Sequence, residues 1–298
     1  MDNKSLGWGF FAVFCWGTLA TAAGGALEKA HPAWVLGGAF LASSAAFALL
    51  PRLMGLEHAS ESREARGRWR GRLLGLWGLF FFHAFYFEAI RRAPIVEATL
   101  INYLWPLLIV LMAWLVLREP FRPAIAAGVL LGAAGAALVV GGQSAGFEAR
   151  HFRGYALALG SAATWSSYTV MLRRWGGGRE FLLPASIWSA LLSGLWLAAA
   201  GWPEPPPPKT WGAILYLGAV AIGAAILAWD RAVSGGEVAV LGAMAYFAPF
   251  LSVFFLWLIL GKPIGAPAAA GMVLIVAGGA AAAWTPTVAG GSGRAGER

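Results

Sequence analysis

Charged residues are scarce in this chain. Asp, Glu, Lys and Arg together make up 12% of the 298 residues, against a share of about 25% in ordinary soluble domains. Hydrophobic residues make up 59%, and 40 glycines come in addition. A soluble protein of this size could not bury so much apolar side chain. The composition therefore excludes the soluble classes and predicts that lipid surrounds most of the chain.

Cysteine and catalytic motifs are nearly absent as well. Cys15 is the only cysteine and lies in an apolar run, which excludes a disulfide framework. No H-E-x-x-H or Walker A string occurs. A G-x-S-x-G match at 142–146 follows a predicted transmembrane helix instead of a strand, so it is interpreted as chance. We therefore expect no catalytic residue, no metal and no cofactor.

Long apolar runs are what the chain does have. Each can form a helix of about 20 residues, enough to cross a hydrocarbon core of about 30 Å. The runs are continuous, which favours helices over a β-barrel, and the first is long enough to be a span instead of a signal peptide. The sequence thus predicts an all-α integral membrane protein with ten transmembrane helices. They cover residues 6–26, 33–50, 73–90, 95–117, 124–140, 154–172, 183–201, 211–229, 238–260 and 266–284.

The basic residues are unevenly divided between the connections. With the N-terminus inside, 15 of the 22 Lys and Arg residues lie in cytoplasmic connections, as the positive-inside rule requires. We therefore expect both termini in the cytoplasm. The net charge of +8 does not predict a nucleic-acid partner, because these charges lie in short connections. The arginine-rich stretch 63–72 is interpreted as a stop-transfer signal, with recognition of anionic lipids as the alternative.

The second half of the chain repeats the first at an offset of about 143 residues. The aligned pairs include Tyr103 with Tyr246, Pro106 with Pro249, Trp114 with Trp257 and Glu88 with Asp230. Because each unit has five spans, the second begins on the opposite side of the membrane, so the repeats are inverted. Many secondary transporters have this arrangement, with the substrate near mid-bilayer. We predict units over 1–143 and 144–287 and a disordered tail over 288–298.

Several motifs carry a resemblance to a known family. They are Trp16-Gly17 in the first span, Pro106 followed by Arg118-Glu119 in the fourth, and Trp165 in the sixth. This pattern resembles the EamA-like drug/metabolite transporter superfamily, and the string N-Y-L-W-P at 102–106 is similar to that of its YddG-type aromatic amino acid exporters. Lys262 departs from the pattern, because it stands where the first unit has Glu119. The resemblance implies a secondary transporter of the bacterial inner membrane, not an enzyme.

Depth in the membrane separates the 16 tryptophans. Most lie near span ends, as in an interfacial belt, whereas Trp16, Trp105 and Trp165 fall near the middle of their spans. A buried indole N–H needs an acceptor, which a neighbouring carbonyl in a packed helix pair would also provide. Because three such residues share one depth, we expect them to line a substrate cavity.

The fourth span is predicted to kink. Pro106 cannot donate to the carbonyl of Asn102, and Pro249 frees the carbonyl of Ala245 in the same way. Both prolines are hinge candidates; a simple packing kink satisfied by a nearby Ser or Thr is the alternative. The polar groups near these kinks suit an ammonium or a carboxylate. They are Thr99, Asn102, Tyr103 and Tyr246.

Further candidates lie in the third and sixth spans. His83, with Tyr86 one turn on, would donate to a substrate carboxylate or relay a proton; a neutral core histidine is the alternative. Glu88 and Asp230 lie nearer the span ends beside arginines, so we expect a salt bridge or gate pair from them instead of substrate contact, and both are candidates for proton coupling. The sixth-span candidates besides Trp165 are Ser166, Tyr168 and Thr169.

The charge distribution also narrows the cargo. No cluster of Lys or Arg lies at mid-membrane, which argues against sugar phosphates, whereas a zwitterion with an aromatic ring fits an indole-rich site. We predict an exporter of aromatic and other large neutral amino acids that works by alternating access. The alternatives are an exporter of another metabolite or drug, and a membrane-embedded enzyme or lipid-handling protein. A G-x-x-x-G at 128–132 predicts that the fifth span packs on the tenth within a monomer, or that these spans form a dimer contact.

Overall fold

The computed structural model describes residues 3–27, 29–53, 65–120, 122–141, 148–175, 179–260 and 264–283, and every regular element in these ranges is a helix. The predicted tail at 288–298, the G-x-S-x-G match at 142–146 and Lys262 lie outside the described residues. In chain order the helices are α1 (Asn3–Leu27), α2 (Pro32–Leu53), α3 (Ala65–Leu76), η1 (Trp77–Phe81), α4 (Phe82–Arg92), α5 (Ile95–Asn102), α6 (Trp105–Leu117), α7 (Pro123–Gly141), η2 (Ala149–His151), α8 (Phe152–Trp175), α9 (Arg179–Ala199), α10 (Pro208–Tyr216), η3 (Leu217–Ala224), α11 (Ala225–Gly235), α12 (Val238–Met244), α13 (Phe247–Leu260) and α14 (Ala266–Ala283).

Seven helical stretches of the described chain are long and apolar enough to cross a membrane. They are Pro32–Leu53, Trp69–Arg92, Glu97–Leu117, Pro123–Val140, Phe181–Ala199, Pro208–Gly235 and Val238–Phe255. The chain is therefore a multi-pass membrane protein, which confirms that its main solvent is lipid. The other three predicted spans coincide with α1, α8 and α14, which do not belong to that set of seven.

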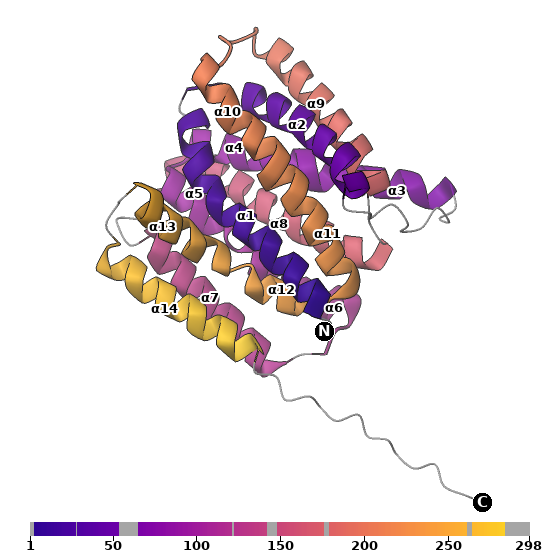
Figure 1. Ribbon diagram of the computed structural model, residues 1–298. Coiled ribbons are helices and arrows are strands. Elements are labelled where there is room, and N and C mark those ends of the chain that lie inside the picture. The colour runs from indigo at the N-terminus through magenta and orange to yellow at the C-terminus, as the bar shows by residue number, and fades with distance from the viewer. Residues whose placement is uncertain are drawn as a thin grey trace, which may run out of the picture.

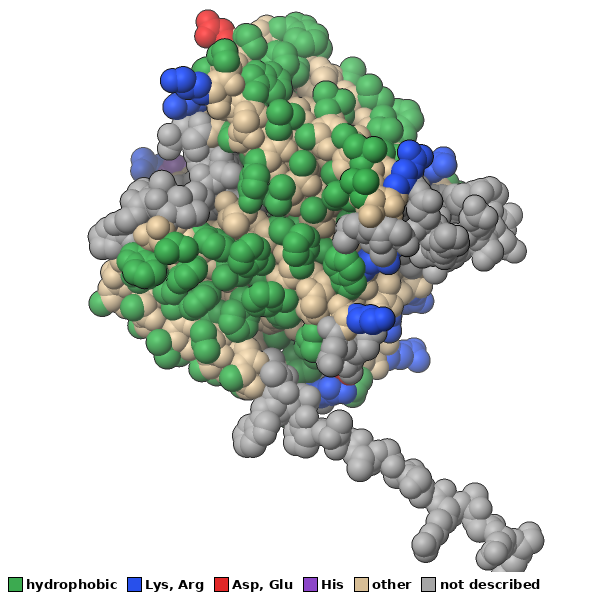
Figure 2. Space-filling model, in the orientation of Figure 1, with side chains coloured by type: hydrophobic (Ala, Val, Ile, Leu, Met, Phe, Trp, Pro, Cys, Tyr) green, Lys and Arg blue, Asp and Glu red, His purple; other side chains and the backbone are tan. Residues whose placement is uncertain are grey.

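The surface agrees with this solvent. The face shown in Figure 2 carries mostly hydrophobic side chains, and Lys and Arg side chains gather at its edges. Large apolar side chains remain uncovered on membrane-length helices, for example Leu41 at 66% and Leu130 at 62% exposure. In water a surface of this kind is an association or aggregation site. In a bilayer it meets lipid tails.

Two of the predicted spans are interrupted where a proline follows. Tyr103 and Leu104 separate α5 from α6, and Ala245 and Tyr246 separate α12 from α13. Each break lies just before the repeat-related Pro106 or Pro249, which lack the N–H that a continuous helix uses. The two interrupted helices occupy matching positions of the two halves of the sequence.

Two other membrane helices each contain a π-helical segment. The stretch from α3 to α4 includes η1, of five residues, and the stretch from α10 to α11 includes η3, of eight residues. A π-helix pairs residues five apart instead of four, and it is frequent at functional sites. A π-helical segment leaves the apolar pattern of a span unchanged, so the sequence does not predict η1 or η3.

The helices α7 and α14 lie side by side along one edge of the molecule (Figure 1). Glycines make the contact. A Cβ placed on Gly271 would lie 2.5 Å from the carbonyl oxygen of Gly135, and one placed on Gly278 would lie 2.5 Å from that of Gly128. Small residues allow helix backbones this close in lipid. The predicted packing of the fifth span on the tenth within one chain is confirmed.

The connection between α1 and α2 carries His31, whose ring caps the second helix. Its Nδ1 accepts a hydrogen bond from the Ala33 N–H at 3.3 Å, which requires that this nitrogen be unprotonated. Burial and the positive charge of Arg91 lower the pKa of His31, while the negative charge of Glu88 opposes them. The folded state therefore favours the neutral imidazole.

We expect acidification to destabilise the protein through this cap. Because the pKa of His31 is lower in the folded than in the unfolded chain, its stabilisation is complete above the usual value of 6.5 and decreases as the pH falls below it. His31→Asn keeps an acceptor at the cap and does not titrate. Its melting temperature should therefore fall less than that of the wild type between about pH 7.5 and pH 5.5. Equal decreases in both proteins would contradict this role.

Candidate functional site

The three mid-span tryptophans meet in one cluster. The ring centroid of Trp16 on α1 lies 6.0 Å from that of Trp105 on α6 and 5.6 Å from that of Trp165 on α8. The second and third rings are 6.4 Å apart, and all three pairs are edge-to-face, with interplanar angles of 83° to 88°. Such pairs stabilise by about 0.5–1.5 kcal/mol beyond the burial of their area. A further aromatic ring can join them in the same geometry.

Trp229 of α11 is a fourth member that the sequence analysis placed in the interfacial belt. Its ring centroid lies 5.2 Å from that of Trp16 and 6.1 Å from that of Trp105, and its side chain is fully buried. The expectation was wrong because the predicted span ended at 229, whereas the helical stretch continues to Gly235. The Trp229 Nε1 donates to the Thr169 hydroxyl at 3.2 Å. We call Trp16, Trp105, Trp165 and Trp229 the tryptophan cluster.

Phe82 connects the tryptophan cluster to the candidates of the third span. Its ring centroid lies 5.3 Å from that of Trp165 and 4.9 Å from that of His83. It also stacks nearly parallel on Tyr86, at 6.4 Å and 14°. Phe82 could not be singled out from the sequence, because one phenylalanine in an apolar run does not indicate which residues lie beside it in the fold.

The two π-helical segments present repeat-related carbonyl groups to this site. The Trp16 Nε1 donates to the carbonyl of Ala221 in η3 at 3.0 Å. The His83 Nδ1 donates to the carbonyl of Leu79 in η1 at 2.6 Å. Leu79 and Ala221 are 142 residues apart, the same offset that aligns Glu88 with Asp230. Each segment is thus held by a side chain that belongs to, or borders, the tryptophan cluster.

The polar residues of the fourth span bond to neighbouring helices. The Thr99 hydroxyl lies 2.9 Å from the Tyr86 hydroxyl, and Asn102 Oδ1 accepts a hydrogen bond from the Ser161 hydroxyl at 3.1 Å. Asn102 is 7% exposed, while Tyr103 is half-buried at the break between α5 and α6. The Ser161 hydroxyl also lies 3.0 Å from the carbonyl of Phe82, so Thr99 and Asn102 both lie near α4.

The sixth-span candidates are all buried in α8. The Ser166 hydroxyl lies 2.7 Å from the carbonyl of Ala162 on its own helix and 2.9 Å from that of Trp105 on α6, which is not the Asn102 carbonyl that Pro106 leaves without its N–H. The ring of Tyr168 lies 5.2 Å from that of Trp165. Within the described chain its hydroxyl has no hydrogen-bond partner, although the side chain is only 1% exposed. A buried phenol without a hydrogen-bond partner can form a hydrogen bond with a polar group of a bound ligand.

Two expectations for the second unit differ from the structure. The carbonyl of Ala245 is not free, because it accepts a hydrogen bond from the Ala248 N–H at 3.0 Å, as the chain tightens before Pro249. Tyr246 is 1% exposed, and its ring packs against Gly132 of α7, a residue that does not belong to the tryptophan cluster. The repeat alignment predicted the same role for Tyr246 as for Tyr103, but the two side chains have different surroundings.

The two acidic gate candidates occupy different environments. Glu88 pairs with Arg91 at 3.1 Å and with Arg92 at 2.7 Å, all within α4. Asp230 is 3% exposed and follows Trp229 on α11. The carboxylate of Glu88 is therefore engaged on its own helix, as the nearby arginines predicted, whereas Asp230 lies directly beside the tryptophan cluster.

Glu119, which follows α6, ties the first half of the chain to the second. Its carboxylate accepts hydrogen bonds from the N–H groups of Val238 and Ala239, at 3.1 and 3.2 Å, and so caps the N-terminus of α12. Beside it, Arg122 pairs with Glu237 at 3.0 Å. The sequence analysis assigned no role to Glu119, because the groups that it caps are 119 and 120 residues away.

Comparison with known proteins agrees with this arrangement. The sequence model of the EamA-like transporter family matches residues 3–141 and 152–283. The aromatic amino acid exporter YddG of Ancylobacter novellus is 34% identical over 288 residues, which cover 92% of this chain and 95% of that protein. The aromatic amino acid exporter YddG of Salmonella typhimurium is 26% identical over 199 residues, or 64% of this chain and 67% of that protein.

A solved crystal structure of a protein with 32% identity has the same fold. Its TM-score is 0.85, and the superposition covers 94% of this chain and 96% of that one. The family match extends over most of the sequence in two segments, and its members are transporters, not enzymes. The chain therefore belongs to the EamA-like transporter family.

Proposed function

We propose that this chain exports aromatic and other large neutral amino acids across the bacterial inner membrane. The observation that carries the proposal is the tryptophan cluster, in which Trp16 and Trp105 each lie 5.2 to 6.4 Å from the other three indoles, on four helices in all. An aromatic side chain can replace one edge-to-face partner by another at little change in free energy. The 34% identical relative is named for the export of the same class of substrate.

The ammonium and carboxylate groups of the substrate would form hydrogen bonds with side chains beside the tryptophan cluster. The amide of Asn102 and the paired hydroxyls of Tyr86 and Thr99 are hydrogen-bonding groups near α4, and the phenol of Tyr168 belongs to a ring 5.2 Å from that of Trp165. Such neutral groups suit a zwitterion, whose net charge is close to zero. A phosphorylated sugar would need several cationic side chains at the same depth.

Transport by alternating access follows from two inverted units. We assign ten transmembrane helices to units at 1–143 and 144–287, which form a monomer with both termini in the cytoplasm. Three pairs of features support the repeat: the two segments of the family match, the two interrupted helices, and the two π-helical carbonyls. Pro106 and Pro249 would act as hinges.

The ion pairs at the helix ends would act as gates. Glu119 and the Arg122–Glu237 pair hold α6 and α7 against α12 at one membrane surface. Rocking of the two units would break these contacts between α12 and the first half of the chain. Glu88 pairs with arginines of its own helix, so it would have to exchange them for a partner on another helix to act as a gate. Asp230 is buried and directly follows Trp229 of the tryptophan cluster, so it is our choice for proton coupling.

Flux through proteoliposomes tests the proposal. The reconstituted protein should move labelled phenylalanine and tryptophan down their gradients, and should not move a sugar phosphate. A pH gradient should change the initial rate in the wild type and leave it unchanged in Asp230→Asn. Flux of the sugar phosphate without flux of either amino acid would refute the proposed substrate class.

A further inference from the structure

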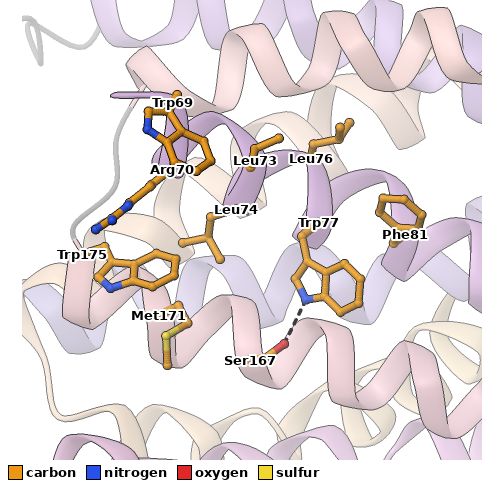
Figure 3. A pocket seen from close by; sticks show the side chains of 10 residues that line it. All are labelled: Trp69, Arg70, Leu73, Leu74, Leu76, Trp77, Phe81, Ser167, Met171 and Trp175. Carbon is orange, nitrogen blue, oxygen red and sulfur yellow. Dashed lines mark hydrogen bonds between the residues drawn. The ribbon is translucent and has the colours of Figure 1, made fainter. Parts of the chain in front are cut away.

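A groove lies apart from the tryptophan cluster, between the stretch α3–η1 and helix α8 (Figure 3). Its volume is about 560 Å³, and eight of its ten lining side chains are apolar. Several of them are open to the surroundings, with Leu73 at 54% and Trp77 at 39% exposure. Because these residues belong to a membrane-length helix, the groove opens sideways toward lipid.

The groove has a charged end and an apolar end. Trp69, Arg70 and Trp175 lie together at one end, and Phe81 lies at the other (Figure 3). From Arg70 to Phe81 the chain advances eleven residues, about 16 Å at about 1.5 Å per residue. This is about half of a hydrocarbon core of about 30 Å. The groove therefore has the depth of one leaflet.

The interior of the groove offers nothing to a polar ligand. Its one uncharged polar side chain, Ser167, already accepts a hydrogen bond from Trp77 Nε1 at 2.9 Å and donates to the carbonyl of Thr164 at 3.0 Å. The other interior walls are hydrocarbon, aromatic rings and the thioether of Met171. A free amino acid would leave its charged groups without partners here, whereas an acyl chain would not.

The open end of the groove attracts negative charge. The guanidinium of Arg70 lies 5.9 Å from the ring of Trp69 and is exposed, and none of the described residues that line the groove is acidic. Two further exposed arginines add positive charge: Arg72, two residues after Arg70 on α3, and Arg174 in the last turn of α8. Trp69 and Trp175 occupy the level at which indoles meet lipid headgroups.

We propose that this groove binds one acyl chain of an anionic phospholipid, with the lipid phosphate against Arg70. Basic pockets between membrane helices recognise anionic headgroups, and guanidinium groups bind phosphate through two hydrogen bonds. Arg70 would then hold a specific lipid, in addition to the predicted role of the arginine-rich stretch in fixing the orientation of the chain in the membrane. This site shares no residue with the tryptophan cluster, so the proposal does not depend on the substrate.

Native mass spectrometry of the full-length protein tests the proposal. The delipidated chain is mixed with phosphatidylglycerol or with phosphatidylcholine of the same acyl chains. We expect the wild type to retain phosphatidylglycerol preferentially. Arg70→Gln should retain about five-fold less of it, the effect of one basic residue near an anionic surface. Leu73→Trp, which fills the groove from α3, should lose the bound lipid. Met171→Trp fills it from α8 and provides a second variant should the first not fold.

Lys209→Gln is the matched control, because it removes one exposed positive charge at the start of α10, outside the groove. It should retain phosphatidylglycerol like the wild type. Glycerol 3-phosphate, which has the headgroup charge without acyl chains, should not compete. Equal retention by Arg70→Gln, equal retention of both lipids by the wild type, or displacement of the lipid by free phenylalanine would each overturn the proposal.

Discussion

Trp165→Ala should reduce the export of phenylalanine and tryptophan by at least about ten-fold, since about 1.4 kcal/mol of lost binding has that effect. Trp165 is the ring with the most partners in the site: Trp16, Trp105, Phe82 and Tyr168 all lie within 6.4 Å of it. Its removal opens the aromatic surface against which a substrate ring would pack. The loss of its buried side chain should also lower the free energy of unfolding by about 3–5 kcal/mol.

Two further variants separate binding from folding. Trp165→Phe keeps a ring in place, so it should fold with a smaller loss of stability and transport phenylalanine at an intermediate rate. Trp188→Ala removes an indole that is 57% exposed on α9, and should transport as the wild type does. The proposed site would be wrong if Trp165→Ala exported either amino acid at the wild-type rate.

Gly271→Ala should destabilise the protein by about 2–3 kcal/mol, the range for overpacking that the structure cannot easily relax. The new Cβ would lie 2.5 Å from the carbonyl oxygen of Gly135 and 2.9 Å from the backbone nitrogen of Val139. Backbone atoms of α7 cannot rotate away as a flexible side chain can, so α14 would have to move outward. The melting temperature of the purified protein measures this effect.

Gly194→Ala is the control for the same substitution. Gly194 lies inside α9, and a Cβ placed there would meet no atom within 4 Å. Alanine favours a helix over glycine by about 0.5–1 kcal/mol, so this variant should be as stable as the wild type or more stable. If both variants had the same melting temperature, close contact between α7 and α14 would not explain the glycines.

The sequence predicted the features that depend on composition and spacing. Long apolar runs required a lipid-embedded helical protein, and the depth of Trp16, Trp105 and Trp165 within their runs was sufficient to single them out. Their rings indeed meet. The glycines at 128 and 132 in the fifth span likewise indicated a close helix contact, because backbone approach in lipid requires small residues at helical spacing.

Other features depend on geometry that no pattern encodes. Trp229 belongs to the tryptophan cluster only because its helical stretch is 28 residues long, which moves it away from the membrane surface. The π-helical segments shift every following side chain around the helix axis, and the apolar runs that contain them look continuous. Tyr246 repeats Tyr103 in sequence but packs against α7, because the two units present their matching residues to different neighbours.

The position of a bound substrate is the most direct measure of whether the tryptophan cluster is the transport site. A structure of the protein with 5-bromotryptophan, collected at the bromine absorption edge, would locate one heavy atom of the ligand without any assumption about its pose. We predict a single bromine peak in contact with the rings of Trp16, Trp105, Trp165 and Trp229. A peak confined to the groove of Trp69 and Trp77, or to any place away from these four indoles, would contradict the proposal.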